Sequence, residues 1–121
     1  MAATFEVTGE EYVREYHPLM TDPDSGRREA APGKRTFCGH CGSALWAWDP
    51  RWPELIHPHA SAVDTELPVP PQHVHMMVGS RASWVEVCRV SGDSTFDAYP
   101  DESLAQWHRR LGLEDDGPAT A

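Results

Sequence analysis

The sequence predicts a small, mainly β domain with one helix near its C-terminal end. Short segments of alternating polar and apolar residues predict the strands, and prolines and glycines separate these segments. Only residues 99–113 have the spacing of an amphipathic helix. The chain of 121 residues has the size of one domain. We expect that domain to span residues 1–113, followed by a disordered acidic tail over residues 114–121.

The composition predicts a soluble protein of a reducing compartment. Ten basic and nineteen acidic residues give a formal net charge of −9, which repels phosphate backbones, so we expect no nucleic-acid partner. No apolar run approaches the ~20 residues that span a bilayer, so we expect no membrane partner. The first residues, "MAATFEVTGEE", do not resemble a signal peptide. Three cysteines do not make a disulfide framework, and a cytoplasmic location follows.

The first half of the chain predicts strands that are interrupted by loops. Residues 4–20 alternate on either side of a turn near Gly9. Residues 21–36 are rich in turn-forming residues and predict a loop, either a hairpin connection or a helical turn at "RREAA". Residues 43–48, "SALWAW", alternate again. The prolines of residues 49–71 exclude a long helix and a central strand, and they predict a surface segment with short extended pieces.

The last part of the chain predicts two more strands and an extended piece. The strands are "HVHMMVG", residues 73–79, and "SWVEVCRV", residues 83–90. They join at a turn near Ser80. A second turn, "SGD" at residues 91–93, leads into the extended segment "TFDAY".

The predicted helix has a start signal, an apolar face and a stop signal. Asp101 is the expected N-cap, because its carboxylate can accept a backbone N–H, and Gly112 can end the helix in the left-handed conformation. The residues at positions i, i+3, i+4 and i+7 of the face are Leu104, Trp107, His108 and Leu111.

The tetrapeptide Cys-Gly-His-Cys at residues 38–41 has two alternative uses. A redox pair needs a helix that begins at the first thiol and lowers its pKa, but here an alternating segment follows. A zinc knuckle instead needs a tight turn that points backbone N–H groups at two thiolates, and Gly39 and Gly42 permit such a turn. The pattern favours Cys38 and Cys41 as zinc ligands. Two thiols without a metal remain the alternative.

A structural zinc needs four ligands, and the sequence has no second Cys-x-x-Cys motif. Cys88 is a candidate third ligand, although a lone cysteine in a strand is more often a small core residue. His57 and His59, and also His73 and His75, form His-x-His pairs that place two imidazoles on one face of an extended segment. The alternative for each pair is two histidines that face solvent.

The five tryptophans divide into two groups. Trp46, Trp84 and Trp107 lie in predicted regular elements, and we expect them to fill the core. Trp48 and Trp52 flank a proline-containing turn, so they are expected to be exposed and are the candidates for substrate binding.

Four segments, in this order, carry a resemblance to a known family: "TFCGHCGSALW", "HPHASAVDTELPVPP", "HVHMMVGSRASWVEV" and "FDAYPDESLAQWHRRLGL". Over roughly residues 4–113 the chain resembles the C-terminal part of the glutathione-dependent formaldehyde-activating (GFA) family, which also includes centromere protein V. The resemblance implies a zinc-stabilised β-tent fold. It also implies carbon–sulfur chemistry, in which formaldehyde is joined to the thiol of glutathione.

The resemblance implies two zinc sites, of which this sequence keeps only a part. Cys38 and Cys41 match the second pair of the structural site. The N-terminal Cys-x-Cys and the catalytic cysteine cluster of the family pattern are absent from this sequence. The resemblance therefore implies a zinc-binding domain similar to a carbon–sulfur lyase for glutathione or aldehyde-type thiol adducts, with reduced or altered activity and with no catalytic residue assigned.

Two other functions stay open. The chain could be a non-enzymatic module that binds a partner or a small molecule, with a structural or vestigial knuckle and a Trp- and Pro-rich surface over residues 46–71. It could also be a small metalloenzyme that combines the histidine pairs with Cys41 or Asp64. A bound zinc would need water, a histidine or a second copy of the chain to complete its shell, and the last of these predicts a homodimer.

Overall fold

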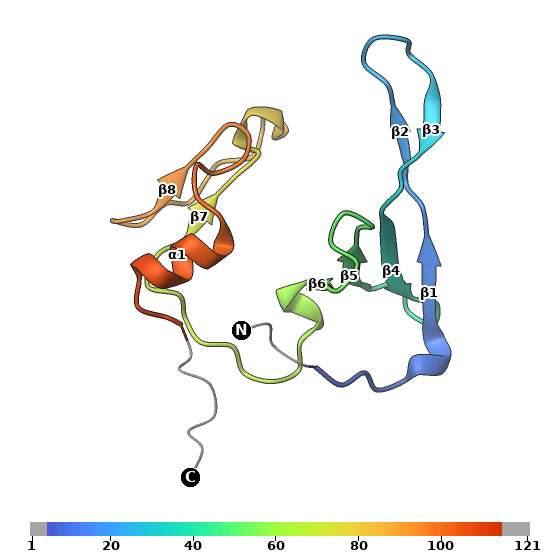
Figure 1. Ribbon diagram of the computed structural model, residues 1–121, viewed down its shortest axis with the longest axis horizontal. Helices are drawn as coiled ribbons and strands as arrows, with labels where there is room; N and C mark the ends of the chain where they lie inside the picture. The colour runs from blue at the N-terminus through green and yellow to red at the C-terminus, as the bar shows by residue number, and fades with distance from the viewer. Residues whose placement is uncertain (1–4, 115–121) are drawn as a thin grey trace. The chain divides into compact units, whose positions relative to one another are not determined.

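The computed structural model describes residues 5–114, which form two compact units, residues 5–67 and residues 68–114. Short strands dominate, and one α-helix lies near the C-terminal end (Figure 1), which confirms the predicted mainly β class. The single domain over residues 1–113 stays a prediction. The predicted tail lies outside the described residues from residue 115 onward.

The unit of residues 5–67 is built on an antiparallel sheet with the strand order β1-β4-β5-β6. Its strands are β1 (Val13–Tyr16), β4 (Lys34–Cys38), β5 (Ala44–Trp48) and β6 (His57–Pro58). Gly9 turns the chain in the left-handed conformation with φ 76°, as predicted, but a 3₁₀ turn (Glu10–Tyr12) precedes β1 where the alternation predicted strand. The strand predicted at "SALWAW" is confirmed as β5.

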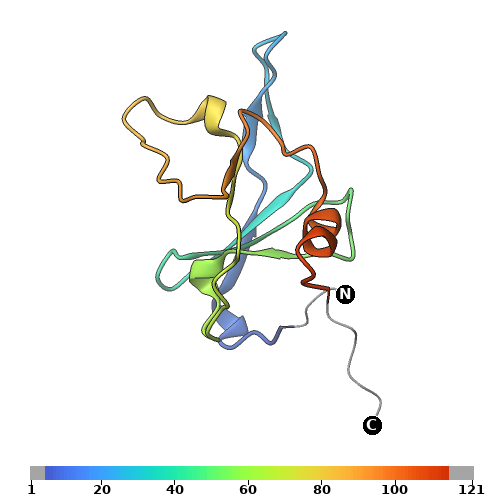
Figure 2. The same ribbon diagram turned by 90° about the vertical axis from the view of Figure 1, so that its left-hand side faces the viewer.

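Strands β2 (Leu19–Thr21) and β3 (Arg28–Ala30) form a hairpin that projects beyond this sheet in both ribbon views (Figures 1 and 2). The prediction of a loop over residues 21–36 is therefore wrong for β3 and β4, and "RREAA" is strand and not a helical turn. The reason is that every residue of β2 and β3 is exposed, so the hairpin needs no apolar face that a sequence pattern could reveal.

Residues 49–67 follow the predicted irregular course. They contain only the short strand β6 and one 3₁₀ turn, η2 (Ala60–Ala62). The backbone N–H of His59 donates a hydrogen bond to the carbonyl of Leu45 at 2.9 Å, which holds the start of η2 against strand β5.

The unit of residues 68–114 contains a short parallel pair, β7 (Val74–His75) and β8 (Ser94–Thr95), and a 3₁₀ turn, η3 (Val78–Ser80). The strand predicted over residues 83–90 is wrong, because that part of the described chain forms no strand. An alternating pattern becomes a strand only where another strand pairs with it, and here residues 94–95 pair with β7 instead.

The helix of this unit, α1 (Leu104–Arg110), begins later than the sequence predicted. Its N-cap is Ser103 and not Asp101. The hydroxyl of Ser103 accepts the backbone N–H of Gln106 at 3.2 Å, and the side-chain oxygen of Gln106 accepts the backbone N–H of Ser103 at 2.7 Å. This reciprocal capping box satisfies two N–H groups, whereas a cap at Asp101 would satisfy one. Gly112 takes the predicted left-handed conformation with φ 66°.

Burial differs from the expected tryptophan core. Among residues 5–114 no hydrophobic side chain is fully buried, and the buried polar residue is Thr36, which is 2 % exposed. Trp46 and Trp107 are half-buried, but Trp84 is 83 % exposed, so its assignment to the core is wrong. Within the same part of the chain, no helix is long and apolar enough to cross a membrane.

Candidate metal and ligand site

The two cysteines of the motif lie on a tight turn between strands β4 and β5. Cys38 ends β4, and its backbone N–H donates to the carbonyl of Ser43 at 2.9 Å. The backbone N–H of Gly42 donates to the carbonyl of Cys38 at 2.7 Å, and Gly42 has φ 80°. Strand β5 follows directly, so the helix that a redox pair requires is replaced by a strand. The local structure matches the predicted turn.

The surroundings of Cys41 favour its thiolate form. The Ser43 hydroxyl lies 3.2 Å from the Cys41 sulfur. That hydrogen bond is the largest cause that lowers the pKa of the Cys41 thiol, followed by the backbone N–H of Ser43 and the side chain of Cys38. Because the thiolate is the form that binds metals and attacks electrophiles, the turn prepares Cys41 for either role.

Gly39 holds this turn against Tyr12, which directly precedes strand β1, and against Arg14 of that strand. Its backbone N–H donates to the carbonyl of Tyr12 at 2.7 Å. A Cβ at this position would lie 2.8 Å from the Cγ of Arg14, closer than real Cβ contacts allow. The absence of a side chain therefore lets the knuckle lie directly on β1.

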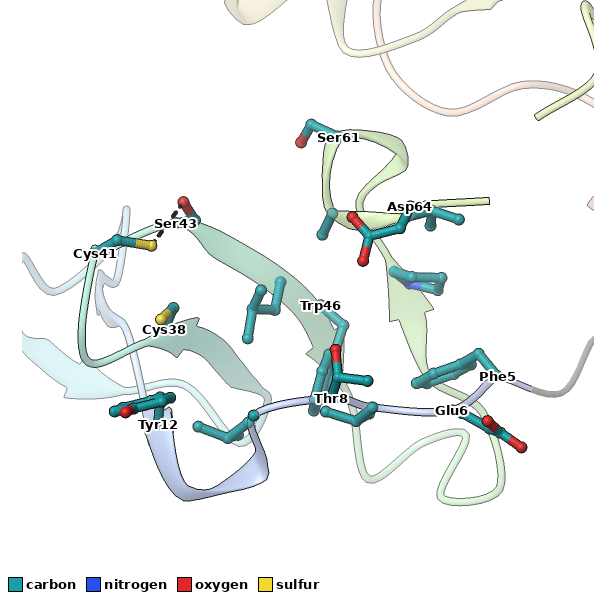
Figure 3. A pocket seen from close by; sticks show the side chains of 17 residues that line it. Phe5, Glu6, Thr8, Tyr12, Cys38, Cys41, Ser43, Trp46, Ser61 and Asp64 are labelled. Atoms are coloured by element: carbon teal, nitrogen blue, oxygen red, sulfur yellow. Dashed lines mark hydrogen bonds between the residues drawn. The ribbon is translucent and has the colours of Figure 1, made fainter. Parts of the chain in front are cut away.

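A cavity of about 370 Å³ opens beside the two cysteines (Figure 3). All the described residues that line it belong to the unit of residues 5–67. Apolar side chains form much of the wall, including Phe5, Val7, Leu45, Trp46 and Val63. The rings of Phe5 and Trp46 lie 6.0 Å apart between centroids, with their planes inclined by 53°. The cavity is of a size that takes a small organic molecule.

One carboxylate points into the cavity. The charged lining residues are Glu6 and Asp64, with no lysine, arginine or histidine among the lining residues of 5–67, and the carboxylate of Glu6 points away from the cavity. Figure 3 shows the carboxylate of Asp64 pointing into the cavity, at the end away from the sulfurs of Cys38 and Cys41. The sequence offered Asp64 as a possible ligand beside the histidine pairs, but nothing in the local pattern indicated that η2 would bring it over β5.

The first histidine pair does not line this cavity. The ring of His57 meets that of Trp52 edge-on, with 6.4 Å between centroids. His59 lines a separate pocket with residues of β4 and β5.

The second histidine pair belongs to the other unit, where one carboxylate holds both rings. His73 Nδ1 lies 3.1 Å from Asp93 Oδ1, and His75 Nε2 lies 3.2 Å from Asp93 Oδ2. The Asp93 side chain is 2 % exposed, and its pKa is held far below the usual range, chiefly by the backbone N–H of Val90. The sequence indicated only a turn at "SGD", so the role of Asp93 was missed.

The remaining candidates lie apart from the cavity. Cys88 is an exposed free cysteine. The Trp48 Nε1 donates to the carbonyl of Pro53 at 3.0 Å, and Trp52 is 49 % exposed with the guanidinium of Arg51 4.6 Å from its ring. Neither tryptophan lines the cavity beside the cysteines, whereas Trp46 does.

The cysteine pair fits half of a zinc site. Two thiols on a turn that stabilises a thiolate are suitable soft ligands. Across residues 5–114, no three side chains from histidine, cysteine, aspartate and glutamate gather into a group that could hold a metal ion. The other ligands of a tetrahedral zinc would therefore come from water or from groups outside residues 5–114 of one copy.

The comparison with known proteins agrees with the resemblance seen in the sequence. The chain is 56 % identical over 85 residues to a protein of Halomonas elongata that is provisionally named a glutathione-dependent formaldehyde-activating enzyme. The match covers 70 % of this chain and 54 % of that protein, so the chain spans about half the length of the curated relative. No family model and no solved structure matches. Over the matched residues, the similarity confirms the predicted resemblance to the GFA family.

Proposed function

We propose that Cys38 and Cys41 bind zinc, and that the chain acts in carbon–sulfur chemistry on thiol and aldehyde compounds, as the GFA resemblance implies. The observation that carries the proposal is the cysteine turn, which favours a thiolate at Cys41 and faces a cavity. The identity to the Halomonas elongata protein, over 85 residues that make up 70 % of this chain, supports the same class of chemistry.

The reaction joins two small molecules. The thiol sulfur of the substrate forms a bond to the aldehyde carbon, the C=O double bond becomes a single bond, and the carbonyl oxygen takes up the thiol proton. When bound by four thiolates, zinc would have no open position for a substrate thiol, so it would stabilise the cysteine turn that faces the cavity. The chain's own contribution is a partly enclosed cavity. Its aromatic wall of Phe5 and Trp46 lowers the exposure of the reactants to water.

The incomplete ligand set leads us to propose that zinc is shared between two copies of the chain. Two knuckles together supply four thiolates, which is a common structural zinc shell. The expected stoichiometry is then one zinc for every two chains. A cytoplasmic location suits such a site, because cytosolic thiols remain reduced and Cys38 and Cys41 are free.

The activity can be tested by NMR with ¹³C-formaldehyde and glutathione. Zinc-loaded protein is expected to speed the exchange between hydrated formaldehyde and the S-hydroxymethyl adduct beyond the rate with the same amount of free zinc. A Cys38→Ser, Cys41→Ser double variant is expected to lose this acceleration, and Cys88→Ser is the matched control that keeps it. An exchange rate equal to that of free zinc would contradict the activity.

A second candidate is a module that binds small molecules or a partner without turnover. Large apolar side chains that remain exposed in the unit of residues 5–67 favour it: Trp52 at 49 %, Leu55 at 40 %, Ile56 at 41 % and Leu67 at 49 %. Such residues often mark interaction surfaces. Binding of thiols or aldehydes without any acceleration of the exchange would support this candidate over the enzyme.

A further inference from the structure

We propose that the cavity beside Cys38 and Cys41 accepts aldehydes that carry an unbranched apolar chain of several carbons, in addition to formaldehyde. The inference rests on the proposed function, because it names the substrate class of the same cavity. Glutathione or another thiol remains the second reactant. Its sulfur bonds to the aldehyde carbon and the carbonyl oxygen takes up the thiol proton, while the alkyl chain stands in place of one hydrogen of formaldehyde.

The floor of the cavity is apolar up to the thiol of Cys38. The other polar lining residues, Ser61 and Asp64 among them, are exposed to solvent. The half-buried lining residues are Cys38 and a set of apolar residues: Val7, Val13, Leu45, Trp46, Ala62 and Val63. A hydrocarbon chain on this floor would leave water for apolar surface, and its end beside Cys38 would meet a thiol.

The aromatic pair lies along the path that leads away from the cysteines. In Figure 3, Trp46 lies between the sulfurs of the two cysteines and the ring of Phe5. The centroids of the two rings are 6.0 Å apart, and their planes are inclined by 53°. A chain attached to a carbon at the cysteine end would therefore run past Trp46 before it reaches Phe5. Aromatic faces of this kind cover a hydrocarbon chain well.

The size of the cavity also favours a ligand larger than formaldehyde. Its volume of about 370 Å³ lies within the range that takes small organic molecules. Formaldehyde has one carbon, so at the cysteine end it would leave the wall of Trp46 and Phe5 uncovered. Each CH₂ group that an apolar chain adds would instead be removed from water, which raises affinity by about two- to fourfold.

Alcohols of increasing length test the chain preference without any reaction. Ethanol, 1-butanol and 1-hexanol are titrated into the full chain, and binding is followed by NMR on the methyl groups of Leu45 and Val63. We expect the affinity to rise by about two- to fourfold for each added CH₂ group. Equal affinities for ethanol and 1-hexanol, or 1-hexanol binding that leaves these methyl signals in place, would overturn the inference.

Variants of matched shape assign the binding to the cavity. Val63→Thr replaces a methyl group of the floor by a hydroxyl and is expected to weaken 1-hexanol binding by about two- to fivefold. Val7→Thr makes the same change at another part of the floor, and it serves as the test if Val63→Thr does not fold. Val69→Thr is the control, since Val69 is 87 % exposed and belongs to the other unit. Equal affinities in all three variants would contradict the inference.

The reaction itself separates this inference from the proposed function. With glutathione as the thiol, NMR compares the exchange of ¹³C-formaldehyde and of ¹³C-pentanal with their adducts, and we expect pentanal to reach half-maximal acceleration at a lower concentration. Length-dependent alcohol binding without acceleration for either aldehyde would uphold the chain preference of the cavity and contradict the proposed function. Acceleration for formaldehyde with no effect of chain length on binding or exchange would uphold the proposed function and overturn the inference.

Discussion

The hydroxyl of Ser43 lies 3.2 Å from the sulfur of Cys41, and this contact is the largest cause that lowers the thiol's pKa. Serine and cysteine are two residues apart, at the point where the knuckle enters strand β5. The turn therefore both positions the sulfur and stabilises its charged form. Substitutions at Ser43 and Gly42 test this arrangement.

Removing the hydroxyl with Ser43→Ala should raise the pKa of Cys41, because the thiolate loses its strongest hydrogen bond. In metal-free protein, the rate of iodoacetamide alkylation at Cys41 should rise with pH along a curve shifted to higher pH. Peptide mass spectrometry measures that rate separately from Cys38 and Cys88. Ser61→Ala, which removes another hydroxyl of the cavity wall, is the control and should leave the curve in place. An unshifted curve for Ser43→Ala would show that the contact has no effect in solution.

Gly42→Ala should destabilise the chain and weaken zinc binding together. Gly42 has φ 80°, a left-handed conformation that costs an alanine roughly 1–2 kcal/mol. Gly26 offers a matched control, with φ 69° and equally open space in the β2–β3 hairpin. Urea unfolding should show similar losses for Gly26→Ala and Gly42→Ala, but only the second should raise the dissociation constant for zinc. Equal zinc affinities would mean that the turn geometry does not define the site.

Asp93→Asn should remove much of the acid sensitivity of the unit of residues 68–114. The pKa of Asp93 is lowered in the folded chain, chiefly by the backbone N–H of Val90. Its contribution to stability is therefore present above the ordinary aspartate pKa near 3.8 and is lost as the pH falls from there toward the lower folded pKa.

Hydrogen exchange of β7 and β8 amides at pH 7, 3.5 and 2 measures this effect. Protection in the wild type should decrease on acidification, and in Asp93→Asn it should be weak at pH 7 and change little. Asp97→Asn is a control on the same segment, for an exposed aspartate. A variant with the same pH dependence as the wild type would exclude Asp93 as the cause.

Helix α1 provides a test of its capping box. Ser103→Ala should cost about 1 kcal/mol of helix stability, because the N–H of Gln106 loses its acceptor. Asp101→Ala, at the position that the sequence favoured as the N-cap, should have little effect. Amide exchange in α1 reports the difference, and a larger effect at Asp101 would reverse the assignment.

Features that depend on neighbouring residues could be predicted from the sequence. Alternation predicted β5, and the spacing of Cys38 and Cys41 together with Gly42 predicted the tight turn. Segments that depend on tertiary pairing were predicted less well. Strand β3 is polar and exposed, so no apolar alternation predicts it. Residues 83–90 do alternate, but no described strand pairs with them.

The candidate site likewise combines residues that the sequence predicted with residues that only the fold brings together. The two thiols could be found from the sequence, but Asp64 joins them only because η2 lies over β5, and Asp93 joins His73 and His75 only because β8 pairs with β7. Each of these carboxylates lies 18 or more residues from its site in the sequence. No local pattern links positions so far apart, so only the fold reveals them.

Zinc binding at the cysteine turn is the central prediction for this protein. Native mass spectrometry of protein purified without chelator measures metal and oligomeric state together. We predict zinc at one ion for every two chains, lost in Cys38→Ser and in Cys41→Ser and retained in Cys88→Ser. A folded chain that binds no zinc, or a zinc content unchanged by Cys38→Ser and Cys41→Ser, would contradict the account.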